Sequence, residues 1–383
     1  MKFRYWNAIL GWLLLLAGGC VEPYTPEVLE APNSFLVVNG FINANGPTTI
    51  QLLRTQNLSE ETMPPAETRA LVRIESDNGE GYTLQETGLG SYTIGPLHLS
   101  PLQQYRLFIR TSNGKEYASD FVEAKQTPAI DEVSWAPVDN EVQIYVSSHD
   151  PSNNTWYYRW EFESTWQFRS ALFSNFKYVN DTVEFRTDAD PPIYHCWKSA
   201  NSTSIQLSNS VRLSQDVISK FRLFTLPSDA EQLGIKYSIL VKQYALTRDA
   251  YEYWETLKKN TESMGTLFDP LPSQLKGNIR NLQDPNEPVV GFMSASTTQE
   301  KRMFINSRDL PREWRLFNPT CQLPDTFLFS RDRVADYFRS GVLIPLNELY
   351  PEGSPFPVGY TYSNLNCVDC RTKGTNVKPA YWE

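Results

Sequence analysis

Cys20 is the residue whose surroundings most clearly predict a covalent reaction. Lys2 and Arg4 precede the nine-residue apolar run 8–16, and two glycines stand directly before the cysteine. A basic start, a short apolar run and small residues at its end are typical of a secretory signal peptide. Such a run is too short to cross a bilayer as a helix, for which about 20 residues are needed. The pattern predicts removal of residues 1–19 and acylation of the Cys20 thiol; the alternative is an exported protein in which this cysteine is incidental.

Acylation would tie the mature chain to a lipid membrane. Two or three acyl chains, at about 0.8 kcal/mol per buried CH₂ group, hold a protein on a bilayer essentially permanently. The segment that follows, 20–33, contains three Pro and three Glu and shows no hydrophobic periodicity. We expect this segment to be a lipidated tether between the membrane and the folded part of the chain.

Four further cysteines follow: Cys196, Cys321, Cys367 and Cys370. An even number in an exported chain favours disulfides, and the spacing does not choose among the three pairings that four cysteines allow. Redox pairs share the Cys367-x-x-Cys370 spacing, but they open a helix in a thioredoxin-like unit, which the surrounding Gly, Asn and Pro residues do not predict. A zinc site needs about four N or S ligands, and only His195 stands nearby.

The other candidates for catalysis or metal binding stand alone. His98 and His149 belong to no catalytic motif, and we expect them to be loop histidines. Asp188 and Asp190 offer the hard oxygen ligands that calcium prefers, although an acidic turn is the commoner explanation for such a pair. The sequence contains no nucleophile elbow, no zinc-protease motif and no phosphate-binding glycine loop. We therefore expect no catalytic residue, no cofactor and no bound metal.

A cluster of aromatic residues suggests ligand binding. Exposed, these rings would form a platform on which sugars could stack; buried, they would be core. They alternate with Arg159, Glu161 and Glu163, and an apolar face opposite a charged face is typical of a half-buried strand. The alternation therefore favours a core position for the cluster, which comprises Trp156, Tyr158, Trp160, Trp166 and Phe168.

The elements around these residues predict a mainly β protein. Residues 34–127 contain short runs in which apolar and polar residues alternate, and no helical stretch. This pattern favours an immunoglobulin-like β-sandwich. Asn113-Gly114 would supply the left-handed residues of one tight hairpin, and Thr127-Pro128 would mark the end of this domain. The expected strands are 35–42, 48–54, 69–75, 81–86, 91–94, 104–111 and 115–120.

The larger region, 128–383, predicts a β-rich, disulfide-linked domain with a few short helices. Strands are expected at 132–135, 141–147 and 155–163. The run 237–246 is apolar on both faces, which predicts a central strand.

Two helices are expected in the same region. Thr247 is a plausible N-cap for a helix over 248–259, where Glu255 and Lys259 would pair across one turn. A shorter helix is expected over 331–340, after Ser330. Near the chain end, the large apolar side chain of Trp382 indicates that the tail over 367–382 packs back onto this domain. We expect a disulfide of Cys367 or Cys370 to hold the tail there.

Several stretches resemble the domain of unknown function 4249 family, lipoproteins of the outer membrane in Bacteroidota. That resemblance implies lipid anchorage in the outer membrane, with a cell-surface orientation left open. Such proteins are often encoded beside TonB-dependent outer-membrane receptors, which implies such a receptor as a partner, and the family supplies no catalytic residue. The similar stretches are 196–199 (CWKS), 237–246 (YSILVKQYAL), 250–254 (AYEYW), 265–278 (GTLFDPLPSQLKGN), 287–292 (EPVVGF) and 367–371 (CVDCR), with Gly374, Lys378, Pro379 and Trp382.

The charge of the chain excludes one class of partner. The net charge is −9, and no basic run exceeds two residues, which argues against nucleic acid as a partner. The sequence therefore predicts a non-enzymatic lipoprotein that assists an outer-membrane β-barrel, a TonB-dependent receptor, in nutrient capture or uptake. The alternative is a free-standing β-sandwich lipoprotein that binds a glycan or a small nutrient, and an enzyme ranks third.

Overall fold

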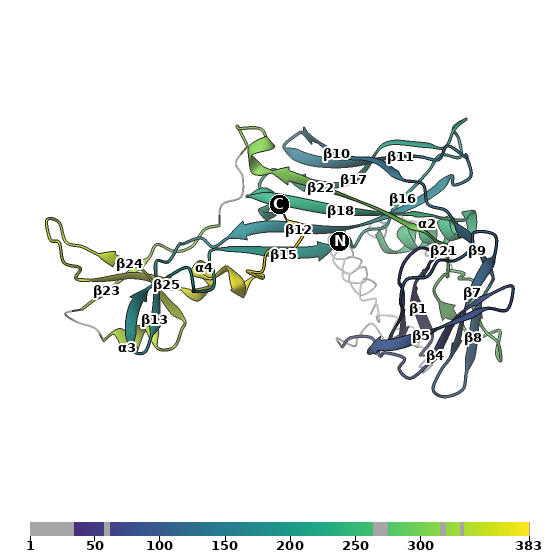
Figure 1. The fold of residues 1–383 in the computed structure, drawn as a ribbon, viewed down its shortest axis with the longest axis horizontal. Helices are drawn as coiled ribbons and strands as arrows, with labels where there is room; N and C mark the ends of the chain where they lie inside the picture. The colour runs from purple at the N-terminus through teal and green to yellow at the C-terminus, as the bar shows by residue number, and fades with distance from the viewer. Residues whose placement is uncertain (1–33, 57–61, 263–274, 315–318, 330–332, 383) are drawn as a thin grey trace, which may run out of the picture.

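The computed structural model describes residues 34–56, 62–262, 275–314, 319–329 and 333–382. The protein is mainly β, as predicted, and elongated (Figure 1). Three parts follow one another along its length, which we call the half-barrel (34–125 with 279–296), the sandwich (130–169, 195–245 and 298–306) and the distal lobe (174–193 and 325–364). No helix in the described ranges has the length and apolar character that a membrane span requires.

The half-barrel is one curled sheet, which curves around a core that includes Leu36, Val72 and Ile109. Its N-terminal strands match the predicted runs closely. They are β1 (Leu36–Gly40), β2 (Ile42–Asn43), β3 (Thr48–Arg54), β4 (Leu71–Ser76), β5 (Gly81–Gly88), β6 (Ser91–Ile94), β7 (Gln104–Arg110), β8 (Glu116–Ser119) and β9 (Val122–Lys125). An immunoglobulin-like arrangement of two packed sheets is not shown by this pairing.

A return segment that the sequence did not assign to this lobe completes the half-barrel. β19 (Ile279–Asn281) pairs with β8, β20 (Val289–Val290) runs parallel to β1, and β21 (Ala295–Ser296) lies between β2 and β9. Glu287 fastens the segment, because its carboxylate accepts hydrogen bonds from Lys115 (2.6 Å), Tyr117 (2.7 Å) and Asn281 (2.7 Å). Burial alone would raise the pKa of Glu287, but these three donors hold it below its ordinary value.

The hairpin at Asn113-Gly114 differs in detail from the prediction. Gly114 adopts a left-handed conformation, with φ at +86°, and Asn113 does not. The Asn113 side chain instead accepts hydrogen bonds from the Thr111 hydroxyl (2.6 Å) and the Lys115 backbone N–H (3.3 Å). One left-handed residue therefore suffices for this turn, because the asparagine stabilises it through its side chain.

The sandwich packs two antiparallel sheets face to face. Trp160 stacks on Phe221 across the interface, with ring centroids 4.9 Å apart, and Phe162 lies 5.0 Å from Phe224. The run 237–246 forms a central strand, as predicted. One sheet is β10 (Ile130–Val138), β11 (Glu141–His149) and β17 (Val217–Pro227); the other is β15 (His195–Asn201) and β16 (Gln206–Asn209) beside β12 (Tyr157–Arg169), then β18 (Lys236–Ala245) and β22 (Thr298–Asn306).

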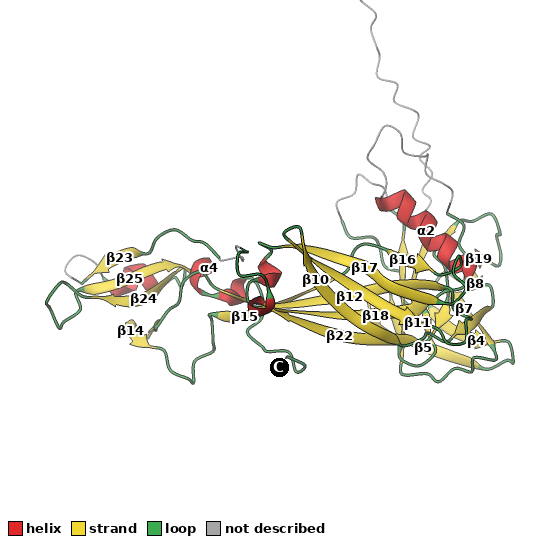
Figure 2. Cartoon of the chain, turned by 90° about the horizontal axis from the view of Figure 1, so that it is seen from above, coloured by secondary structure: helices red, strands yellow, loops and turns green. Residues whose placement is uncertain are grey.

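Helix α2 (Arg248–Glu262) follows β18 and covers the ends of β12 and β16 (Figure 2). The Thr247 hydroxyl accepts a hydrogen bond from the Ala250 N–H (3.2 Å), so the predicted N-cap is confirmed. The predicted Glu255–Lys259 pair is present at 2.9 Å. Local sequence therefore determines this helix, which continues to Glu262 beyond the predicted end.

The chain crosses between the half-barrel and the sandwich at two adjacent points. Thr127 lies on the first crossing and Thr297 on the second, and both are buried. The Thr127 N–H donates to the Thr297 hydroxyl (2.8 Å), the Thr127 hydroxyl donates to the Thr297 carbonyl, and the Thr297 N–H donates to the Lys125 carbonyl (2.9 Å). The Thr127 hydroxyl also accepts from the Ala245 N–H (3.0 Å). These bonds join the two lobes at a buried junction.

The distal lobe lies at the far end of the long axis from the half-barrel (Figure 1). Its three-stranded sheet has the order β23-β25-β24. The expected helix over 331–340 is present as α3, Ser330 lies outside the described residues, and Gly341 follows with φ at +72°. The elements are the hairpin β13 (Phe176–Val179) and β14 (Thr182–Phe185), β23 (Asp325–Leu328), α3 (Val334–Phe338), β24 (Leu343–Leu349), β25 (Gly359–Asn364) and the adjoining α4 (Leu365–Val368).

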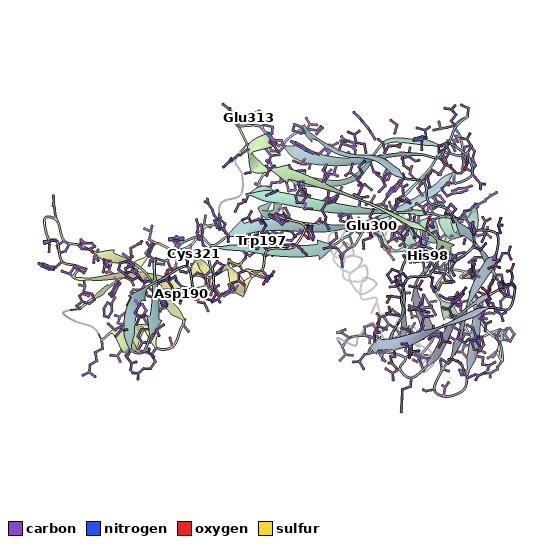
Figure 3. The ribbon with its side chains drawn as sticks, viewed as in Figure 1. His98, Asp190, Trp197, Glu300, Glu313 and Cys321 are labelled. Atoms are coloured by element: carbon purple, nitrogen blue, oxygen red, sulfur yellow. A yellow bond between two sulfur atoms is a disulfide. The ribbon has the colours of Figure 1, made fainter. Side chains whose placement is uncertain are left out.

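Two disulfides hold the distal lobe and the C-terminal tail to the sandwich. Cys196 on β15 is bonded to Cys370, and Cys321 is bonded to Cys367. Figure 3 shows Cys321 where the distal lobe joins the sandwich. The predicted pair of bridges is therefore present, with a pairing that the sequence left open.

The tail beyond these bridges packs back onto the sandwich, as predicted. Trp382 is only 4% exposed and lies edge-on to Phe304, at 5.6 Å between ring centroids. Tyr381 lies under the guanidinium of Arg302 (3.5 Å), and its hydroxyl is hydrogen-bonded to that of Thr165 (2.9 Å). The tail therefore covers part of the sheet face that points away from the sandwich core.

Removing the Cys196–Cys370 bridge is expected to free the tail and lower the melting temperature. A loop of this length contributes about 4–5 kcal/mol in the chain-entropy model. We predict that Cys196→Ser/Cys370→Ser melts at a clearly lower temperature by circular dichroism and loses its C-terminal peptide early in limited proteolysis. In Cys321→Ser/Cys367→Ser, the Cys196–Cys370 bridge still holds the tail. A Cys196→Ser/Cys370→Ser variant with wild-type melting and an equally resistant tail would contradict this assignment.

Candidate functional site

The end of the distal lobe exposes a cluster of apolar side chains, which we call the distal tip: Phe329, Tyr350, Phe356 and Val358. Their exposed fractions are 45%, 50%, 75% and 38% respectively. The 350–358 loop (YPEGSPFPV) contains three prolines, which cannot donate backbone hydrogen bonds and so end the β24–β25 ladder. Exposed apolar side chains that form a contiguous patch are typical of interaction sites.

A packed aromatic core holds the distal tip in place. Phe327 is fully buried and contacts Phe338 (5.7 Å between centroids) and Tyr360 (6.4 Å). The Phe329 N–H donates to the Val358 carbonyl (2.9 Å), which continues the pairing of the two strands into the tip. A Cβ atom at Gly359 would lie 1.8 Å from the Phe327 carbonyl oxygen, so only glycine fits there. The tip therefore stands on a closely packed aromatic base.

The second candidate site is a crevice of about 240 Å³ between the half-barrel and the sandwich. The half-barrel contributes the Gly40–Phe41 corner after β1, and β12, β18 and α2 contribute the other wall. The double crossing at Thr127 and Thr297 fixes the two walls relative to each other. Residues that line this crevice include Asn39, Phe41, Arg159, Glu161, Tyr244 and Trp254.

An arginine held between two aromatic rings forms one side of the crevice. The Arg159 guanidinium lies 4.1 Å from the centroid of Trp254 and 4.9 Å from that of Tyr244. It is ion-paired with Glu161, whose other oxygen accepts a hydrogen bond from the Tyr244 hydroxyl (2.8 Å). Burial, together with the Glu161 carboxylate, raises the pKa of Tyr244, so its hydroxyl stays protonated as a donor. Phe41 closes the edge at 4.9 Å from Tyr244.

Cys20 and the tether over 20–33 lie outside the described residues. The other four cysteines form the two disulfides, and Cys367 and Cys370 are each bonded to a different partner rather than to one another.

Four of the five aromatic residues of the cluster lie on β12 and are core, the position that their alternation favoured. Tyr158 and Trp160 are fully buried, and Trp166 is 8% exposed. Tyr158 donates to the buried Asp216 carboxylate (2.8 Å), and burial followed by this carboxylate raises its pKa. Only Trp156 is half-buried. The cluster therefore does not form an exposed stacking platform.

Two of the isolated polar candidates, His149 and Asp190, have structural partners. His149 was expected in a loop, but it is the last residue of strand β11 and pairs there with Val217 of β17. Its side chain pairs with Asp131 (2.8 Å), and the hydrogen bond with that carboxylate raises the histidine pKa. Asp190 accepts from Lys177 (2.8 Å) and from the Thr187 N–H (2.7 Å), and these bonds, that of Lys177 first, lower its pKa to about 2. Asp190 lies in the distal lobe (Figure 3). Within the described ranges, no group of three or more His, Cys, Asp or Glu residues could hold a metal ion.

Both candidate sites use residues that the sequence analysis did not single out. Arg159 and Glu161 were expected on the polar face of their strand, where they are, but α2 and the half-barrel cover that face. Phe356 stands between Pro355 and Pro357 in a loop. An aromatic residue flanked by prolines, where no strand or helix can bury it, is the signal that could have indicated the tip.

Comparison with known proteins identifies the family. Residues 21–302 match the family described as Domain of unknown function (DUF4249). No curated protein matches the chain. The matched range covers the half-barrel and nearly all of the sandwich, whereas the distal tip lies beyond it. Because the match extends over well more than half of the sequence, the chain belongs to the DUF4249 family.

Proposed function

We propose that this chain is a non-enzymatic lipoprotein of the outer membrane that assists an outer-membrane β-barrel, a TonB-dependent receptor, in nutrient capture or uptake. Acylated Cys20 anchors it, and the distal tip docks on the barrel. The exposed aromatic tip is the observation that carries the docking proposal. The signal-like N-terminus and the resemblance to outer-membrane lipoproteins support the location and the kind of partner.

The position of the distal tip suits a protein that is anchored at Cys20 and contacts a second protein in the same membrane. The described chain begins at residue 34, just before β1 in the half-barrel, and the distal lobe lies at the opposite end of the long axis (Figure 1). An extended chain the length of 20–33 spans at most roughly 50 Å. The length of the folded part adds to this distance, and the distal tip at its far end would contact a second protein in the same membrane.

The chemistry of the tip also suits a protein partner. Aromatic side chains supply much of the binding energy at protein interfaces, and charged residues are depleted from interface centres. The loop from Tyr350 to Val358 carries only one charged residue, Glu352. Its three prolines limit the conformational entropy that docking would cost.

One observation favours the second candidate function, a free-standing lipoprotein that binds a glycan or small nutrient. The crevice beside Arg159 is concave, has aromatic and polar walls, and lies between two lobes, where ligand sites are common. The two functions are compatible, because the crevice and the distal tip belong to different parts of the molecule.

The lipid anchor can be tested at its cysteine. Cleavage and acylation both need the Cys20 thiol, so Cys20→Ser should abolish labelling with a radioactive or clickable fatty acid and release the protein from the membrane fraction. Cell fractionation followed by immunoblotting measures the release. A Cys20→Ser variant that stays with the outer membrane at the wild-type level would show that acylation is not what holds the protein there.

Docking can be tested with paired surface variants. Tyr350→Ser/Phe356→Ser removes the two most exposed aromatic rings of the tip, whereas Leu89→Ser/Leu102→Ser removes even more exposed apolar side chains from the half-barrel (81% and 94% exposed). We predict that a TonB-dependent receptor co-purifies with the wild type and the half-barrel variant in mild detergent. The tip variant should retain about tenfold less, as expected when interface anchors are lost.

Quantitative mass spectrometry of the purified complexes gives the readout, and circular dichroism verifies that both variants are folded. Equal recovery of the barrel with both variants, or no barrel with the wild type, would contradict docking through the tip.

A further inference from the structure

The crevice between the half-barrel and the sandwich plays no part in the proposed docking. Its two walls are fixed by the hydrogen bonds between Thr127 and Thr297, so its shape does not depend on a partner at the distal tip. A preformed concavity can bind a ligand at a smaller cost of ordering the protein. Its volume of about 240 Å³ limits that ligand to a small molecule.

Charge on the crevice wall is balanced. Arg159 and Glu161 form an ion pair, with 11% and 47% of their side chains exposed. An anion would meet the Glu161 carboxylate and a cation would meet the Arg159 guanidinium, so neither sign of charge is favoured. An uncharged ligand avoids both repulsions.

Some hydrogen-bond donors and acceptors that line the crevice have no partner within the described protein. Among the described residues, the Arg159 guanidinium donates one hydrogen bond, to Glu161, and its other N–H groups have no protein acceptor. The Asn39 amide and the Ser294 hydroxyl have no side-chain hydrogen bond to any described residue. The wall therefore offers donors and acceptors at short spacing, which suits a ligand whose groups both donate and accept, as hydroxyls do.

Aromatic rings complete the lining. Trp254 is half-buried on α2 and Phe41 is half-buried after β1, so each retains accessible surface. The C–H face of a sugar ring packs on such rings, while the hydroxyls at its edge bond to planar polar groups such as amide, carboxylate and guanidinium.

We propose that this crevice binds an uncharged, polyhydroxylated small molecule the size of a single sugar ring. Arg159, Glu161 and Asn39 bond to its hydroxyls, and Trp254 packs against its apolar face. The site is independent of docking through the distal tip, so either proposal can fail without the other.

The test is saturation-transfer NMR on the full mature chain with defined probes: glucose, galactose, mannose and N-acetylglucosamine, each at millimolar concentration. The wild type should transfer saturation to at least one of them. Thr49 is an exposed residue on β3 that lines the crevice, so Thr49→Trp should fill it and abolish the signal. Thr83 is exposed on β5 and does not line the crevice, and Thr83→Trp is the matched control that should keep the signal.

A second variant distinguishes loss of binding from loss of folding. Glu161→Gln keeps the shape of the side chain and an acceptor for the Tyr244 hydroxyl, but removes the charge that strengthens hydrogen bonds to ligand hydroxyls. Affinity for the bound sugar should fall several-fold, while the circular dichroism spectrum stays unchanged. No transfer to any of the four sugars, or equal transfer in Thr49→Trp and the wild type, would overturn the proposal.

Discussion

The Thr127 hydroxyl joins three chain segments at the point where the half-barrel meets the sandwich. It donates to the Thr297 carbonyl and accepts from the Ala245 N–H (3.0 Å), in a position from which water is excluded. Leaving such buried groups unpaired would cost about 1–3 kcal/mol each. The orientation of the two lobes depends on this junction, and so do the shape of the crevice and the distance from the tether to the distal tip.

Local sequence patterns predicted most strands and helix α2, because period-2 and period-3.6 burial is encoded within a few neighbouring residues. The return segment was not predictable in this way. Its strands, β19 to β21, have two or three residues each, and they pair with strands more than a hundred residues earlier in the chain. Nothing local distinguishes Val289–Val290 from any other pair of valines. The cysteine count likewise predicted two bridges, but the partner of Cys196 depends on where the fold brings the tail.

The same limit applies to the candidate sites. Alternation placed Arg159 and Glu161 correctly on the polar face of β12, yet the periodicity of one strand says nothing about what lies over that face. Trp254 reaches Arg159 only because α2 folds back across the strand. Phe356 differs in the opposite direction. A large apolar residue is normally expected to be buried, but Phe356 is exposed. It stands between Pro355 and Pro357 in the loop that connects β24 to β25, and its side chain is 75% exposed.

Site-specific photo-crosslinking in intact cells tests the docking claim most directly, because it needs no detergent. A photoreactive amino acid placed at position 356 should yield an adduct with a TonB-dependent receptor, and the same amino acid at position 102 in the half-barrel should not. Adducts with that receptor from both positions alike, or from neither, would contradict the account in which the distal tip is the surface that meets the barrel.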